Sequence, residues 1–145
     1  MKLPWIIMAL VAGIFLPIQA GLNSCMGKSL ENPVYASLLS FIVGTAIVFV
    51  YVLVKQHVTW AGLKTAPFYT WLAGVFGAFY VTTLILAFPR IGPALTFGLI
   101  ILGQMTISVL LDHFNILVSH QHSINSWRIL GILLIVCGVV LVRKY

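Results

Sequence analysis

The chain has 145 residues, of which 61% are hydrophobic and 7% are charged, and its mean hydropathy is +1.12. Soluble domains carry about 25% charged residues, so this composition excludes a soluble globular protein and indicates an integral membrane protein. The net charge of +6 does not indicate nucleic-acid binding, because the eight Lys and Arg residues lie at or near the ends of apolar runs, where basic residues anchor membrane spans.

Five apolar runs follow one another along the chain, and they predict an all-α membrane protein with one transmembrane domain over residues 1–145. Continuous runs of this length are typical of membrane helices, whereas the strands of β-barrels alternate between apolar and polar residues. The predicted spans are about Leu3–Leu22, Val34–Val54, Phe68–Phe88, Ile91–Leu111 and Trp127–Val142.

Span one contains a proline and two amides. Pro17 removes one backbone hydrogen bond and is expected to kink the helix. Gln19 and Asn23 are four residues apart and therefore share a helix face. Two interpretations stay open for this pair: the polar end of a helix near the membrane surface, or part of a polar vestibule for a solute.

Span two begins at the Asn32-Pro33 boundary, and Ser37 and Ser40 share one of its faces. Serine hydroxyls often bond to carbonyls of their own helix, so these two residues are weak indicators of a site. Span three ends in the segment Phe88–Pro93, a connection so short that spans three and four are expected to be antiparallel neighbours.

Span four carries the most polar groups of any span. Gly92, Thr96 and Gly103 are predicted to share one narrow face, where small residues allow another helix to approach closely. Gln104, near mid-span, begins a polar ladder with Ser108 and Asp112. Lipid offers no hydrogen-bond partner, so Gln104 is expected to face protein or a watery cavity, either joining two helices or lining a solute path.

The loop after span four holds His113, His120 and His122, and we interpret these histidines as solvated loop residues. A metal site would need more ligands in a fixed geometry. The sequence contains no pair of nucleophile and base, no phosphate-binding glycine loop and no carboxylate pair. We therefore expect no metal, no cofactor and no enzymatic activity.

Several blocks in this order resemble the short, five-span YdcZ-like branch of the drug/metabolite transporter superfamily over nearly the whole chain. They are Gln19–Asn23, Asn32-Pro33, Ala36-Ser37, Ser40–Thr45, Gly74–Val81, Pro89–Ala94, Gly103-Gln104 and Asp112–Phe114. The resemblance implies a bacterial inner (plasma) membrane protein whose helical bundle is half of a ten-span, inverted-repeat transporter. The sister branch of small multidrug-resistance proteins pairs two copies and binds cations with a Glu in span one; here span one offers Gln19 and no carboxylate.

The leading functional hypothesis is a secondary transporter that moves a small neutral, zwitterionic or amphipathic solute by alternating access. The alternatives are a non-transporting membrane subunit or assembly factor, and a channel. The expected partners are the solute, membrane lipid and a second, antiparallel copy of the chain. The candidate solute-binding residues are Gln19, Asn23, Ser37, Ser40, Phe97, Gln104 and Ser108.

The basic residues give no preference for either orientation in the membrane. With five spans, four of them fall on the side of the N-terminus (Lys2, Lys55, Lys64 and Arg128) and four on the other side (Lys28, Arg90, Arg143 and Lys144). Orientation normally follows an excess of Lys and Arg in short loops. The sequence therefore predicts dual topology and an antiparallel homodimer.

Overall fold

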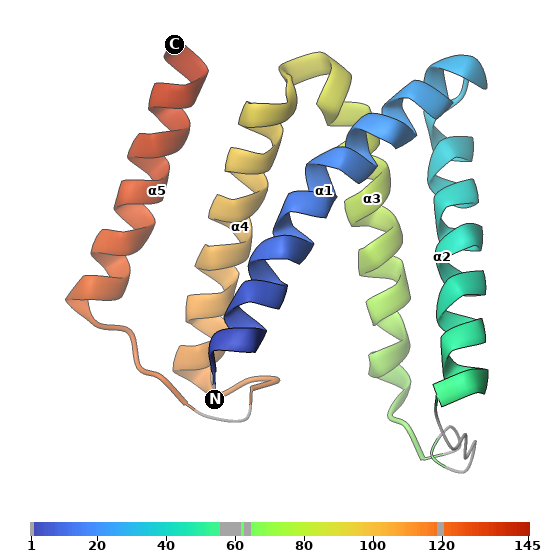
Figure 1. Cartoon of the computed structure of the whole chain (residues 1–145). Helices are drawn as coiled ribbons and strands as arrows, with labels where there is room; N and C mark the ends of the chain where they lie inside the picture. Colours follow the sequence, from blue (N-terminus) through green and yellow to red (C-terminus); the bar gives the residue numbers. More distant parts are fainter. Residues whose placement is uncertain (1, 56–61, 63–64, 119–120) are drawn as a thin grey trace. The chain divides into compact units, whose positions relative to one another are not determined.

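The computed structural model describes residues 2–55, 62, 65–118 and 121–145, and the regular secondary structure in these ranges is all helical, without strands (Figure 1). The elements are α1 (Leu3–Ser29), α2 (Pro33–Lys55), η2 (Phe68–Trp71, a 3₁₀ helix), α3 (Leu72–Ile91), α4 (Pro93–Phe114) and α5 (Ser126–Lys144). The described residues form five spans long and apolar enough to cross a membrane, with η2 and α3 forming one of them, so the predicted all-α, five-span fold is confirmed. Lys64 and His120, which entered the predictions above, lie outside the described residues.

Helix α1 is longer than the predicted first span, because it continues past Leu22 to Ser29. The added turns contain Asn23, Ser24 and Gly27, and all three are buried. A Cβ atom at Gly27 would lie 3.0 Å from the Cα of Pro33, so the absence of a side chain there allows α2 to start directly against the end of α1. Pro17 lies inside this helix, which continues through it.

The connection between α3 and α4 is shorter than the predicted turn. Helix α3 includes Pro89 and ends at Ile91, and only Gly92 separates it from α4, which begins at Pro93. Gly92 has φ +80°, a left-handed conformation that side chains disfavour. The prediction that Gly92 lies on a face of the fourth helix is therefore wrong: it is the residue that caps the start of α4.

The first compact unit ends at Arg90 and contains α1, α2 and almost all of α3. Its small core includes Ala20 from α1, Ala36 from α2, and Leu84 and Ile85 from α3. Small side chains on α1 and α2 let these two helices pack closely along their joined ends (Figure 1). Most other large apolar side chains of this unit are exposed, as expected for helices that face lipid.

The second compact unit contains α4 and α5, which lie side by side (Figure 1). A Cβ atom at Gly98 would lie 3.0 Å from Val139 Cγ2, so α5 approaches α4 closely at this position. The side chain of Asn125 caps α5 by accepting a hydrogen bond of 2.9 Å from the backbone N–H of Arg128. One transmembrane domain over the chain and the antiparallel packing of spans three and four stay predictions.

Candidate functional site

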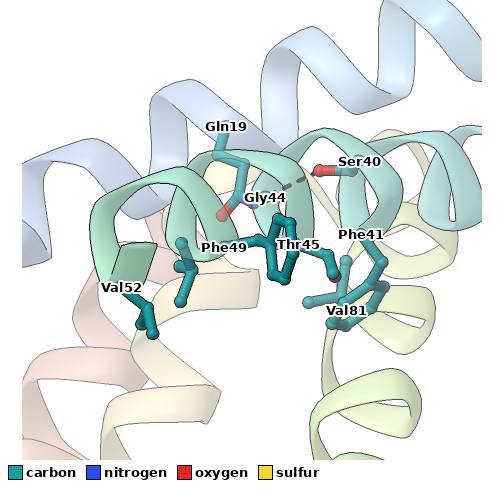
Figure 2. A pocket seen from close by; sticks show the side chains of 9 residues that line it. Gln19, Ser40, Phe41, Gly44, Thr45, Phe49, Val52 and Val81 are labelled. Atoms are coloured by element: carbon teal, nitrogen blue, oxygen red, sulfur yellow. Dashed lines mark hydrogen bonds between the residues drawn. The ribbon is translucent and has the colours of Figure 1, made fainter. Parts of the chain in front are cut away.

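The α1–α2 contact contains a cluster of three polar side chains centred on one hydroxyl. Ser40 Oγ of α2 accepts hydrogen bonds from Asn23 Nδ2 at 3.2 Å and from Gln19 Nε2 at 3.4 Å. Both amides come from α1, where their spacing of four residues places them on the same side of the helix (Figure 2 shows Gln19 reaching toward Ser40). Three of the residues predicted for solute binding are therefore brought together.

A second hydroxyl pair joins α2 to α3. Ser37 Oγ lies 3.0 Å from Thr82 Oγ1, and Ser37 is 4% exposed. Ser37 lies three residues before Ser40, so both hydroxyls are on neighbouring positions of the α2 surface that faces protein. A polar row thus runs from α1 across α2 to α3 inside the first unit.

A cavity of about 540 Å³ opens beside this row (Figure 2). Its polar groups are the Gln19 amide and the hydroxyls of Ser40 and Thr45, and its remaining wall is apolar. Four lining residues of α2 follow each other at steps of four and so form one stripe: Ser40, Gly44, Val48 and Val52. The other lining residues are Phe41, Phe49 and, from α3, Val81.

A smaller cavity of about 370 Å³ lies against α1 and α2, and Gln19 and Ser40 line it as well. Asn23 contributes the third polar side chain, and the remaining lining residues, which include Phe15 and Met26, are apolar. The Gln19–Ser40 hydrogen bond therefore borders both cavities, so a change in this bond alters the walls of both.

No charged side chain lines either cavity in the described part of the chain. The sequence contains two acidic residues, Glu31 and Asp112, and neither contributes to these walls. A charged group without a partner is costly to bury at membrane depth. The electrostatics of both cavities therefore suit a ligand, or part of a ligand, without net charge.

The other predicted site residues belong to the second unit. Phe97 is half-buried, whereas Gln104 and Ser108 of α4 are exposed. Among the residues that the structure describes, none forms a hydrogen bond with the Gln104 side chain. Ser108 lines a cavity of about 250 Å³ together with Asp112 and Arg128.

Asp112 and Arg128 form an ion pair that joins the end of α4 to the start of α5. Arg128 Nη2 lies 2.9 Å from Asp112 Oδ2, and both side chains are about three-quarters buried, with 28% and 27% exposed. Arg128 Nη1 also donates to the backbone carbonyl of His122 at 3.0 Å. The Asp112 carboxylate is therefore paired with a basic residue across the loop that joins α4 to α5.

His113 is part of the loop structure and not a free loop histidine. Its Nδ1 accepts a hydrogen bond of 3.3 Å from the backbone N–H of Ile124, and its ring packs edge-on against Phe114 at 4.9 Å. Its backbone carbonyl accepts a hydrogen bond of 2.8 Å from Gln121 Nε2. His113 lies in the last turn of α4 with intermediate exposure, and the loop that follows folds back on it.

Sequence reasoning missed Thr82, Thr45 and Phe49. Thr82 belongs to a group of hydroxyl residues near the end of span three, but no spacing rule pairs it with Ser37, which lies 45 positions earlier. Thr45 and Phe49 could have been found by following α2 from Phe41 in steps of four, since these positions share a face.

Comparison with protein families matches residues 4–141 to a family described as "Putative inner membrane exporter, YdcZ". No curated protein and no solved structure matches the chain.

Proposed function

Because this chain belongs to the family described as "Putative inner membrane exporter, YdcZ" and is a multi-pass inner membrane protein, we propose that it is a secondary transporter that moves a small solute by alternating access. The family assignment points to transport and away from enzymatic activity. The solute that we propose is neutral, zwitterionic or amphipathic.

The observation that carries this proposal is the polar row inside the first unit. Ser40 lies seven residues after the start of α2, about 10 Å along the helix, which places it at the depth of the hydrocarbon core. Asn23 and Ser37 are 5% and 4% exposed. Polar side chains at this depth are costly unless they are paired, and in membrane proteins they frequently mark solute pathways.

The absence of a carboxylate in α1 favours a solute without net positive charge. Gln19 stands in a helix whose described residues include no Asp or Glu, so no fixed negative charge balances a cation there. An amide and hydroxyls donate and accept hydrogen bonds without charge. Such groups bind alcohols and amides, and zwitterions with no net charge, at a lower desolvation cost than an ion whose charge has no partner.

We further propose that two copies work together in antiparallel orientation. Half of the basic residues lie on each side of the membrane, so neither orientation is favoured, and an inverted partner would complete the plan that many transporters use. Gln104 supports this proposal, since its exposed amide needs a hydrogen-bond partner that lipid cannot supply. Phe97, Gln104 and Ser108 remain candidates for solute contact alongside the α1–α2 residues.

A solute screen on purified protein tests the proposal. A specific ligand stabilises the folded form that binds it, so a transported metabolite raises the melting temperature in a concentration-dependent way. Solutes found in this way are then assayed for uptake into proteoliposomes. A non-transporting subunit predicts that stabilising solutes, if found, do not accumulate inside the vesicles.

A further inference from the structure

The larger cavity of the first unit has a polar end and an apolar end. Going along the α2 stripe from Ser40 to Val52, the chain covers twelve residues, or about 18 Å of helix. The hydroxyl of Ser40, with the amide of Gln19 bonded to it, lies at the start of this stripe. The Thr45 hydroxyl follows next to Gly44, and Val48 and Val52 lie at the far end. The walls thus change from polar to apolar in one direction.

From this gradient we propose that the cavity binds an uncharged amphiphile with one hydrogen-bonding end at Gln19 and Ser40 and an apolar body against Val48, Phe49 and Val52. The inference rests on the proposed transport function and names the class of solute that the site takes. The volume of about 540 Å³ falls in the range of about 300–1,000 Å³ that small-molecule sites occupy.

The hydrogen bonds of Ser40 leave one donor for the ligand. A hydroxyl can accept two hydrogen bonds and donate one. Ser40 Oγ accepts from Gln19 and from Asn23, so its own O–H remains to donate. The ligand end that fits here carries an acceptor oxygen, as an alcohol or an amide does.

Gly44 forms part of the cavity wall, and its missing side chain keeps the space open. A Cβ atom at Gly44 would meet no other atom within 4 Å, although the residue lies on the stripe between Ser40 and Val48. A larger side chain at this position can therefore project into the cavity without displacing the helices. Gly13 of α1 also has no atom within 4 Å of such a Cβ, but it lines neither this cavity nor the smaller one, which makes it a matched control.

A lipid acyl chain is the competing occupant, and it differs from the proposed ligand in one respect. An acyl chain fills the apolar end but offers no hydrogen bond to Ser40 or Gln19. A cationic or anionic amphiphile differs in another respect, because the described lining residues include no charge to balance it. Ligands that share one apolar body and differ in the end group separate these cases.

The test uses full-length protein in lipid nanodiscs and four fluorinated probes with the same phenylbutyl body. The probes are 4-(4-fluorophenyl)butan-1-ol, its ammonium and carboxylate counterparts, and 1-butyl-4-fluorobenzene, which has no polar end. Saturable broadening of the ¹⁹F resonance reports binding, and nanodiscs without protein provide the background from partition into lipid. We expect the alcohol to bind saturably to wild-type and Gly13→Leu protein and not to Gly44→Leu protein.

The end group decides the outcome. The probe without a polar end cannot accept the hydrogen bond from the Ser40 hydroxyl, so we expect it to bind about 3- to 10-fold more weakly than the alcohol. Ser40→Ala should remove this difference. The ammonium and carboxylate probes are expected to bind at least about tenfold more weakly than the alcohol. Equal binding of the apolar probe, tighter binding of a charged probe, or absence of saturable binding by the alcohol would each overturn the proposal.

Failure of this inference is distinguishable from failure of the proposed function. If the alcohol does not bind but a solute from the metabolite screen is transported, transport stands and the assignment of this cavity is wrong. If the alcohol binds as expected and no solute is transported, the cavity is a binding site in a protein that does not transport.

Discussion

Replacement of Ser40 by alanine removes the hydroxyl on which two amides of α1 converge. Asn23 is 5% exposed, so Ser40→Ala leaves its Nδ2 group without an acceptor in a buried position. The bond from Gln19 is longer, at 3.4 Å, and exposed, so we assign it a small share of the energy. Hydrogen bonds between membrane helices contribute about 0.6 kcal/mol on average and up to about 1.7 kcal/mol. The Asn23 amide left buried without an acceptor adds to this cost, so we expect a loss of roughly 1–2 kcal/mol.

Thermal unfolding of purified protein measures this loss, followed by the fluorescence of the native tryptophans. Thiol-reactive dyes are unsuitable because Cys25 and Cys137 are exposed in the folded chain. For a chain of this size, about 1–2 kcal/mol corresponds to a decrease of roughly 3–6 °C in the melting temperature. Ser29→Ala is the matched control, since the Ser29 hydroxyl bonds to the Cys25 carbonyl of its own helix, and it should change stability by less than about 0.5 kcal/mol.

A double-variant cycle with Asn23→Ala separates the hydrogen bond from other effects of the substitutions. Once Asn23 is truncated, Ser40→Ala should cost less than it does in the wild-type background, because the two residues share one interaction. Additive losses, or a decrease for Ser40→Ala no larger than that for Ser29→Ala, would refute the reasoning that this cluster joins α1 to α2.

Three further predictions concern other parts of the chain. Thr82→Val should destabilise the protein by about 1 kcal/mol, because it removes the hydrogen bond between Thr82 of α3 and Ser37 of α2. Thr106→Val loses only a hydrogen bond to its own helix and should have a smaller effect in the same unfolding assay; equal effects would count against the α2–α3 hydrogen bond. Asp112→Asn should leave the pH dependence of uptake unchanged, because the carboxylate is held by an arginine; a flattened pH profile would instead identify it as a proton carrier. Reporters active in the cytoplasm or in the periplasm, fused separately to Tyr145, should both give signal, and signal from one reporter alone would exclude the antiparallel homodimer. Two lysines added near Tyr145 should favour one orientation and reduce function, and a copy biased toward the opposite orientation should restore it.

The five spans could be predicted from the sequence because length and apolarity decide whether a helix crosses a membrane. Two boundaries could not be predicted. The sequence predicts that the first span ends at Leu22, yet Asn23, Ser24 and Gly27 are buried and α1 continues to Ser29. The sequence predicts that the third span ends at Phe88, yet α3 continues through Pro89 to Ile91.

The site was partly predictable for a similar reason. Gln19, Asn23 and Ser40 could be identified as candidates because polar residues at membrane depth need partners. Their mutual pairing could not be deduced, since it depends on how α1 and α2 are rotated toward each other, and neither helix has a strongly polar face that fixes this rotation. Thr82 cannot be identified from the sequence as a site residue, because a threonine hydroxyl can equally bond to its own helix, as that of Thr106 does.

The measurement that tests the central claim most directly compares the metabolites released by cells that express the wild-type chain with those released by cells that express Gln104→Leu. Gln104 carries an exposed amide on α4, so leucine should remove a transport function while leaving membrane expression near that of the wild type. The account predicts that at least one neutral, zwitterionic or amphipathic metabolite accumulates outside the cells with the wild-type chain and not with the variant or an empty vector. Identical release profiles from all three, at matched expression, would contradict a transport function.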